Sequence, residues 1–101
     1  MGKIKVIIKR PDEEIGHMTH ISNTLANFQN TVGGYIEVVP LDKENIILCN
    51  EEGKIKGLDF NMAFRGDFLV GTIIVCGIKG EFFKDINLTF EEWKNIVREE
   101  E

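Results

Sequence analysis

The stretch "FLVGTIIVCG", residues 68–77, constrains the fold more than any other part of the chain. It is apolar almost throughout, and its second half is rich in β-branched side chains, which favour an extended backbone. A strand that is apolar at nearly every position is covered on both faces, whereas alternation with polar residues indicates one solvated face. The stretch therefore predicts a central strand buried on both sides, with Gly71 as the position of a bulge.

Three other segments have the two-residue period of strands. Residues 3–9 alternate lysines with isoleucine and valine, as expected of a strand with one solvated face. The segments "YIEVV" at 35–39 and "NIILC" at 45–49, joined by a short connection, predict a hairpin. Proline, glycine and clustered acids predict a loop at 10–19, and "NEEGKIKG" predicts a turn at 50–57.

The first of two predicted helices begins near residue 24. Leu25, Phe28 and Val32 recur at helical spacing, and Ser22 or Asn23 can cap the first turn. The glycine that follows Val32 can adopt the left-handed conformation that ends many helices.

The second predicted helix lies in "TFEEWKNIVREEE", residues 89–101. Thr89 and Glu92 have the spacing of a capping box, in which each side chain accepts a hydrogen bond from the other residue's backbone. A helical apolar stripe is formed by Phe90, Trp93, Ile96 and Val97.

The order of these elements predicts an α+β fold in a single domain, residues 1–101. Strand, helix, strands and helix follow one another, which is typical of a mostly antiparallel sheet and not of alternating βα units. We expect four to five strands, with the two helices packed on one face of the sheet. A chain of this length buries about two-thirds of the surface that its unfolded form exposes, which is enough for one core.

Charge and apolar patterning disfavour several kinds of partner. With 12 basic and 17 acidic residues, the chain has a net charge of -5, which repels the phosphate backbone of a nucleic acid polymer. No apolar run approaches the roughly 18 residues that cross a bilayer, and the N-terminal residues lack signal-peptide features, so we expect no membrane partner. Cys49 and Cys76 lie in apolar runs, as reduced core thiols do, which favours a cytoplasmic location.

Three motifs place the chain near a known group of proteins. They are "GGYIEVV" at 33–39, "ILCNEEGKIKGLDFN" at 47–61 and "GTIIVCG" at 71–77. In these motifs the chain resembles a family of small domains of unknown function from phages and mobile elements of Gram-positive bacteria, and the resemblance covers nearly the whole chain. It implies no assigned activity, catalytic residue or cofactor. It does imply a small phage-borne or plasmid-borne protein that acts in the cytoplasm of a bacterial host.

The reactive side chains form no catalytic constellation that the sequence reveals. His17 and His20 are three residues apart, but the two cysteines are single members of separate strands, whereas closed zinc sites bring their ligands in close pairs. Acidic neighbours occur in predicted turns or at a helix start, at 12–14, 51–52 and 91–92. Glu37, on a strand between two apolar residues, is the exception. We expect no metal site, no cofactor and no enzymatic activity.

A window without any charged side chain, residues 21–36, is the most unusual polar feature of the sequence. It includes Asn23, Asn27 and Asn30, although asparagine is a poor helix former compared with Glu or Lys. An uncharged amide face can enter an interface without desolvating ions, and amides both donate and accept hydrogen bonds, as nucleobase edges require. The window therefore predicts a contact between copies of the chain, part of a ligand pocket, or both, with an ordinary solvated surface as the remaining alternative.

These features lead to the hypothesis of a homo-oligomeric protein that binds and sequesters a nucleotide-derived immune signal, of the cyclic nucleotide or ADP-ribose type, without turnover. In this hypothesis the amides of the window form hydrogen bonds with the polar edges of the ligand, a tyrosine stacks on it, and lysines or an arginine neutralise its phosphate. The predicted ligand-binding residues are Asn23, Asn27, Asn30, Tyr35, Glu37, Asn50, Lys54, Lys56, Asn61 and Arg65.

Two other classes of function remain open at this point. The chain can be a protein-binding module that inhibits or adapts a host enzyme through a sheet edge or a helix face. A nucleotide-processing enzyme that uses Glu37 or an acidic pair is the third alternative.

Overall fold

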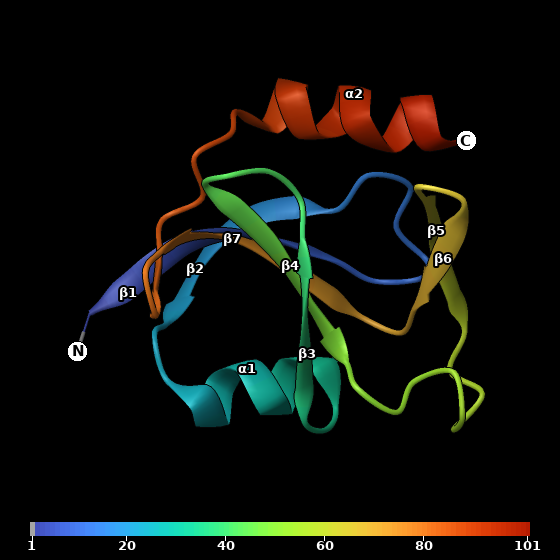
Figure 1. Ribbon diagram of the computed structural model, residues 1–101, viewed down its shortest axis with the longest axis horizontal. Coiled ribbons are helices and arrows are strands. Elements are labelled where there is room, and N and C mark those ends of the chain that lie inside the picture. Colours follow the sequence, from blue (N-terminus) through green and yellow to red (C-terminus); the bar gives the residue numbers. More distant parts are fainter. Residues whose placement is uncertain (1) are drawn as a thin grey trace.

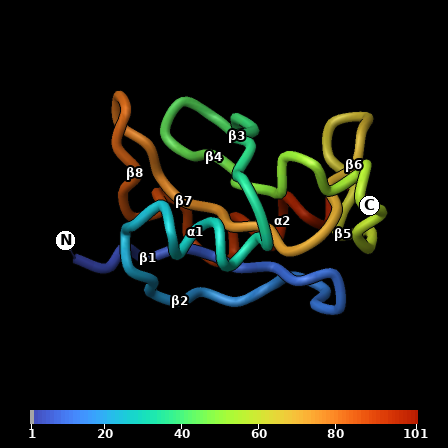
Figure 2. The backbone as a smooth tube through the Cα atoms, turned by 90° about the horizontal axis from the view of Figure 1, so that it is seen from below, coloured from blue at the N-terminus to red at the C-terminus, as the bar shows by residue number. Residues whose placement is uncertain are grey.

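The computed structural model describes residues 2–101 and contains one six-stranded sheet and a separate two-stranded hairpin. The strands of the sheet are β1 (Lys3–Lys9), β2 (His17–Ser22), β3 (Ile36–Pro40), β4 (Asn45–Asn50), β7 (Ile73–Lys79) and β8 (Phe82–Lys84). Their order is β2-β1-β7-β4-β3, with β8 also paired to β7, and every pair is antiparallel (Figure 2). The hairpin consists of β5 (Phe60–Phe64) and β6 (Asp67–Val70). The α+β class is confirmed, with eight strands in residues 2–101 instead of the four to five expected.

The two helices lie on opposite faces of the sheet (Figure 1). They are α1 (Leu25–Val32) and α2 (Phe90–Glu100). Phe28 of α1 belongs to the core layer that contains Ile74, whereas Trp93 of α2 belongs to the layer that contains Val75. The prediction that both helices pack on one face is therefore wrong. Because neighbouring residues of β7 point to opposite faces and those from Ile73 to Cys76 are apolar and buried, each face needs its own cover.

The apolar stretch 68–77 forms two strands and not one. Residues from Ile73 onward form β7, which is buried in the middle of the sheet, so the predicted central strand is confirmed for this part. Gly71, with φ of +71°, turns the chain between β6 and β7 instead of forming a bulge inside one strand. A Cβ there would lie 2.8 Å from Leu58 Cδ1, so the tight turn also needs the small residue.

The predicted loop at 10–19 is partly wrong, because β2 begins at His17 and pairs with β1 along its whole length. Most residues of β2 are half-buried, so apolar and polar side chains do not alternate clearly along this part of the sequence. The cap of α1 is Thr24, whose side chain accepts the Asn27 N–H, and not Ser22 or Asn23 as expected.

Other local predictions are confirmed. Gly33 ends α1 with φ of +83°, and β3 and β4 form the expected hairpin. Thr89 and Glu92 form the capping box of α2. Cys49 and Cys76 are buried free thiols. Within residues 2–101, no helix has both the length and the apolar character required to span a membrane.

Lys9 and Asn61 fasten the β5–β6 hairpin to the main sheet. Lys9 is only 2% exposed, and its ammonium group donates to Asn61 Oδ1 at 2.9 Å and to the Asn61 carbonyl at 3.1 Å. The Asn61 amide in turn donates to the carbonyls of Lys9 and Gly71, both at 2.8 Å. Burial lowers the pKa of Lys9, although the carboxylates of Glu13 and Glu101 partly oppose this. The pair, called the Lys9–Asn61 clamp below, satisfies a buried cation with oxygen acceptors.

We predict that Asn61→Ala destabilises the protein by about 3 kcal/mol, because it leaves the buried Lys9 ammonium short of an acceptor and orphans two carbonyls. Urea unfolding followed by circular dichroism measures the change. Asn30→Ala, at an exposed position of α1, is the control and should change stability by less than about 0.5 kcal/mol. Equal stability of the two variants would contradict the structural role of the clamp.

Candidate functional site

A cleft of about 600 Å³ lies between the sheet and the β5–β6 hairpin. We call it the hairpin cleft. Its walls are the edge strand β3, the end of β4, the turn at 51–55 and the hairpin itself, whose position beside the sheet is seen in Figure 1. The lining residues used below are Glu37, Cys49, Lys54, Arg65, Asp67 and Phe68.

The turn between β5 and β6 positions one of the two cations of the cleft. Arg65 and Gly66 have φ of +50° and +80°, as the two-residue type I′ turns of tight hairpins require. The Arg65 guanidinium donates to the carbonyl of Pro40 at 3.1 Å and to that of Leu41, and it stacks 4.7 Å from the ring centre of Phe64. These contacts hold the guanidinium against the end of β3 and use two of its five N–H donors.

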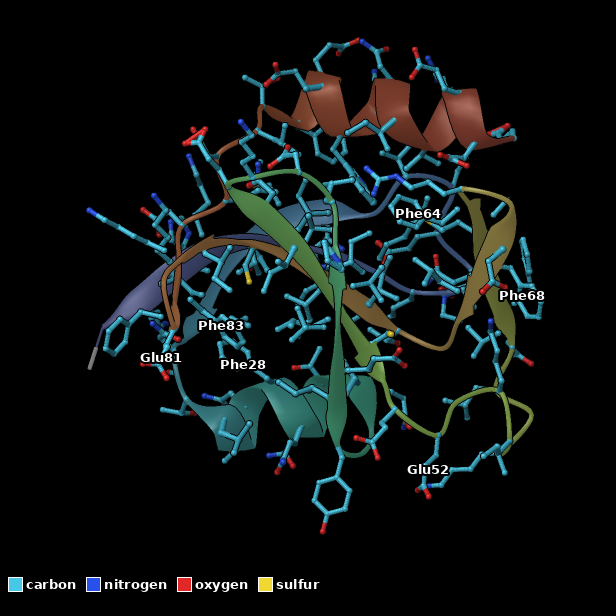
Figure 3. All side chains as sticks on the ribbon, in the orientation of Figure 1. Phe28, Glu52, Phe64, Phe68, Glu81 and Phe83 are labelled. Carbon is cyan, nitrogen blue, oxygen red and sulfur yellow. The ribbon has the colours of Figure 1, made fainter. Side chains whose placement is uncertain are left out.

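Lys54 supplies the second cation of the cleft. Its ammonium group donates to Asp67 Oδ1 at 2.8 Å and lies 4.4 Å from the centre of the Phe68 ring. The hydrogen bond from Lys54, followed by that from the Phe68 N–H, lowers the pKa of Asp67. Figure 3 shows Phe68 on the outer side of the hairpin, whereas Phe64 points toward the interior. Aromatic surface and cation therefore occur together at the mouth of the cleft.

Glu37 and Cys49 form the side of the cleft opposite the hairpin. Burial raises the pKa of the Cys49 thiol to about 11, the Glu37 carboxylate adds to this rise, and Lys54 partly opposes it. The thiol, the carboxylate and the ammonium group therefore line the same cleft. A protonated thiol in this position contributes contact surface and not nucleophilicity.

Four of the ten predicted site residues line the hairpin cleft: Glu37, Asn50, Lys54 and Arg65. The Asn50 amide is already engaged, because its Nδ2 donates to the Val32 carbonyl at 3.2 Å and its Oδ1 accepts the Glu52 N–H at 2.8 Å. Asn50 therefore joins α1 to the turn after β4, and three charged side chains remain for a ligand.

Two other predicted residues have structural contacts away from the hairpin cleft. Lys56 forms an exposed ion pair with Glu52 at 3.5 Å, and Asn61 belongs to the Lys9–Asn61 clamp. The clamp borders a second hollow, of about 610 Å³. Its acidic lining comprises Asp12, Glu13, Glu14, Glu100 and Glu101. This lining repels anions, so a ligand with a phosphate group is better accommodated in the hairpin cleft.

The amides of the uncharged window lie around α1 and do not join the cations. Asn23 donates to the Phe83 carbonyl at 3.1 Å, close to the edge-to-face pair of Phe28 and Phe83 that Figure 3 shows beneath the sheet. Asn27 borders a shallow hollow of about 230 Å³ on this side. Asn30 and Tyr35 are exposed. Within one chain these four residues therefore lie apart from Lys54 and Arg65, and their part in ligand binding stays a prediction.

Sequence reasoning missed two contributors to the cleft. The apolar stretch that predicts a central strand includes Phe68 and begins directly after Asp67, so the sequence does not indicate the exposed outer side of β6. Among residues 2–101, no group of three or more His, Cys, Asp or Glu side chains is arranged to hold a metal ion.

The fold and the cleft together define a small α+β domain with a ligand-sized hollow at one edge of its sheet. Residues 4–97 match the family described as a domain of unknown function, DUF3846, and the chain belongs to this family. Comparisons with curated proteins and with solved structures gave no match.

We predict that Cys49 of the folded protein reacts with iodoacetamide at pH 8 about a hundredfold more slowly than an ordinary thiol, because its pKa is about 11 instead of 9.0. Peptide mapping by mass spectrometry over time measures the rate. The urea-unfolded chain is the reference, and Cys76, whose pKa burial raises to about 12, should react more slowly still. Equal rates for Cys49 in the folded and unfolded chain would contradict this description of the cleft floor.

Proposed function

We propose that the protein binds a small nucleotide-derived molecule in the hairpin cleft and sequesters it without turnover. The observation that carries the proposal is the convergence of a carboxylate, an ammonium group and a guanidinium on a cleft of about 600 Å³ with aromatic side chains. This volume lies within the range of pockets that enclose drug-sized ligands.

The unused hydrogen-bonding groups of the cleft match the parts of a nucleotide. Lys54 retains N–H donors beyond the one that it gives to Asp67, and Arg65 retains three beyond those that bind the two carbonyls. These donors suit a phosphate oxygen. Across the cleft, Glu37 can accept hydrogen bonds from the N–H groups of a base, and the Phe68 ring at the mouth offers a stacking surface.

The charge balance of the cleft narrows the ligand class. Three carboxylates, from Glu37, Glu51 and Asp67, line it beside two cations. A ligand with a single negative charge is therefore favoured over one with several phosphates. Of the two types expected from the sequence, a cyclic nucleotide with one phosphodiester fits better than an ADP-ribose derivative.

Sequestration fits the groups in the cleft better than catalysis does. The Cys49 thiol is protonated at neutral pH, and neither histidine lines the cleft. Glu37 remains the candidate base if a reaction takes place, which makes a nucleotide-processing enzyme the lowest alternative. In the phage setting that the sequence resemblance implies, a binder of this kind acts in the host cytoplasm and withdraws a nucleotide signal from antiviral defence.

We predict that a cyclic mononucleotide at a hundredfold excess over its dissociation constant stabilises the protein by about 2.7 kcal/mol, and that Lys54→Met weakens binding by about tenfold or more. Thermal shift against a panel of cyclic mononucleotides, cyclic dinucleotides and ADP-ribose derivatives identifies the ligand, and calorimetry gives the affinities. Lys56→Met removes a lysine two positions away that lies outside the cleft, and it should leave the affinity unchanged.

Two outcomes would contradict the proposal. The first is the absence of any shift across the panel, and the second is an equal loss of affinity in both lysine variants, which would indicate a nonspecific charge effect. Recovery of intact nucleotide after denaturing the complex supports sequestration, whereas a cleaved product would replace it with enzymatic turnover.

A second candidate, a protein-binding module, is favoured by the exposed apolar side chains next to the cleft. Phe60 is 60% exposed and Ile55 87%, and the ring of Phe60 lies 6.1 Å from that of Phe68. Exposed apolar clusters of this kind mark protein contacts more often than isolated apolar residues do. Phe60→Ser tests this candidate, since it should leave nucleotide affinity intact and abolish any defined protein complex.

A further inference from the structure

β3 is an edge strand of the six-stranded sheet, at the side opposite β2 (Figure 2). The Glu51 N–H donates to the Tyr35 carbonyl at 2.8 Å, which fixes the phase of hydrogen bonding between β3 and β4. Because this bonding alternates along an antiparallel pair, Glu37 and Val39 bond toward β4, and the backbone groups of Ile36 and Val38 point away from it. The sheet therefore ends in a row of outward-facing N–H and C=O groups.

The end of this row has a contact that confirms the phase. The Pro40 carbonyl, two residues beyond Val38, accepts a hydrogen bond from Arg65 Nη1, so it also faces away from β4. Apart from Glu37 and from Pro40 at its end, β3 has few of the usual protections of an exposed edge: its five residues include no lysine, and its pairing to β4 has no bulge. Val38 is 44% exposed.

We propose that β3 pairs in antiparallel fashion with β3 of a second copy, across a two-fold axis that passes through Val38. This register places Val38 opposite Val38, Glu37 opposite Val39 and Ile36 opposite Pro40. Four backbone hydrogen bonds form: two between the Val38 residues, and two from the Ile36 N–H groups to the Pro40 carbonyls, which have a second lone pair free beside Arg65.

Repulsion between carboxylates favours this register over the one shifted to an axis through Glu37. An axis through Glu37 also pairs outward-facing groups, but it places two Glu37 carboxylates directly opposite one another, which is destabilising. With the axis through Val38, each carboxylate faces an apolar Val39. The strand is therefore self-complementary in one register.

The surroundings of β3 also favour a second copy as the occupant of this edge. α1 lies on the face of the sheet toward which Ile36 projects, and Val38 projects to the same face. Residues 21–36, which contain α1, include no charged side chain. Two copies can therefore bring their helices together along the axis without desolvating ions. This accounts for the choice of amides where lysine and glutamate would make a better helix.

Pairing through β3 gives each hairpin cleft a wall from the other copy. Glu37 and Val39 line the cleft, and a new strand would lie about 4.8 Å beyond β3, with its own Glu37 and Val39 on the same face. The open side of the cleft beside β3 is then closed by the second copy. This completion of the site rests on the proposed function, whereas the strand pairing itself does not.

The mass in solution tests the pairing. Sizing chromatography with light scattering should give twice the 11.5 kDa of the chain for the wild type and a single chain's mass for Val38→Lys. The matched control is His20→Lys, which adds a lysine at an exposed position of the other edge strand, β2, and should keep the double mass. A monomeric wild type, or a Val38→Lys dimer, would overturn the proposal.

A cross-linking experiment keeps the test independent of the lysine variants. Val38→Cys should be joined into a covalent dimer by a short bis-maleimide, because the two residues lie opposite one another at the axis. Tyr35→Cys, at a more exposed position away from the axis, should not be joined efficiently. Equal cross-linking of both variants would contradict the register.

Ligand titration separates this proposal from the proposed function. Calorimetry with a cyclic mononucleotide on wild type and Val38→Lys should show weaker binding to the variant. A dimer that binds no nucleotide would keep the pairing and refute the proposed function. A wild type that is monomeric and binds the nucleotide with the same affinity as Val38→Lys would refute the pairing and keep the proposed function.

Discussion

The buried pair of Lys9 and Asn61 determines where the β5–β6 hairpin sits, and the hairpin cleft exists because of that position. The hairpin is not part of the six-stranded sheet, so no ladder of strand hydrogen bonds fixes its orientation. Apolar packing alone tolerates small sliding movements, whereas a buried ammonium group must keep its oxygen acceptors at hydrogen-bond distance. Apolar packing makes the contact between the hairpin and the sheet favourable, and the clamp therefore fixes the orientation of the hairpin in that contact. Arg65, held against the end of β3, adds a second directional contact at the far end of the hairpin.

The parts of the fold that depend on local signals follow from the sequence, and those that depend on tertiary pairing do not. The capping box at Thr89 and the stop at Gly33 are local, and both are where the pattern predicts them. Strand β2 was missed because its residues become half-buried only when paired with β1. The error about the helices was avoidable: a central strand buried on both faces requires cover on both faces, and one layer of helices supplies only one.

For the candidate site, residue type was a better guide than position. The sequence indicates Glu37 as a charge between apolar strand residues, and Lys54 and Arg65 as cations for a phosphate, and the structure brings all three to one cleft. The amides were harder to interpret, because an asparagine side chain satisfies a distant backbone group as readily as a ligand. Asn50 and Asn61 bond to backbone carbonyls that are 18 and 52 residues away in the sequence, and no local sequence pattern predicts such a partner. The helix α1 packs on the opposite face of the sheet from the cleft, so its uncharged surface does not line the cleft within one chain.

In the hairpin cleft, the side chains that the proposed function assigns to the ligand are largely distinct from those that form the apolar core. The exposed polar and aromatic side chains of the cleft come mostly from the 51–55 turn and from β5–β6 and belong to neither apolar layer, although Cys49, Phe64 and Leu69 of its lining do. Substitutions at Lys54, Asp67 or Phe68 can therefore change the chemistry of the cleft at little cost in stability. Under the proposed function, a cleft arranged in this way allows ligand selectivity to change through substitutions of surface side chains while the sheet and its core stay the same.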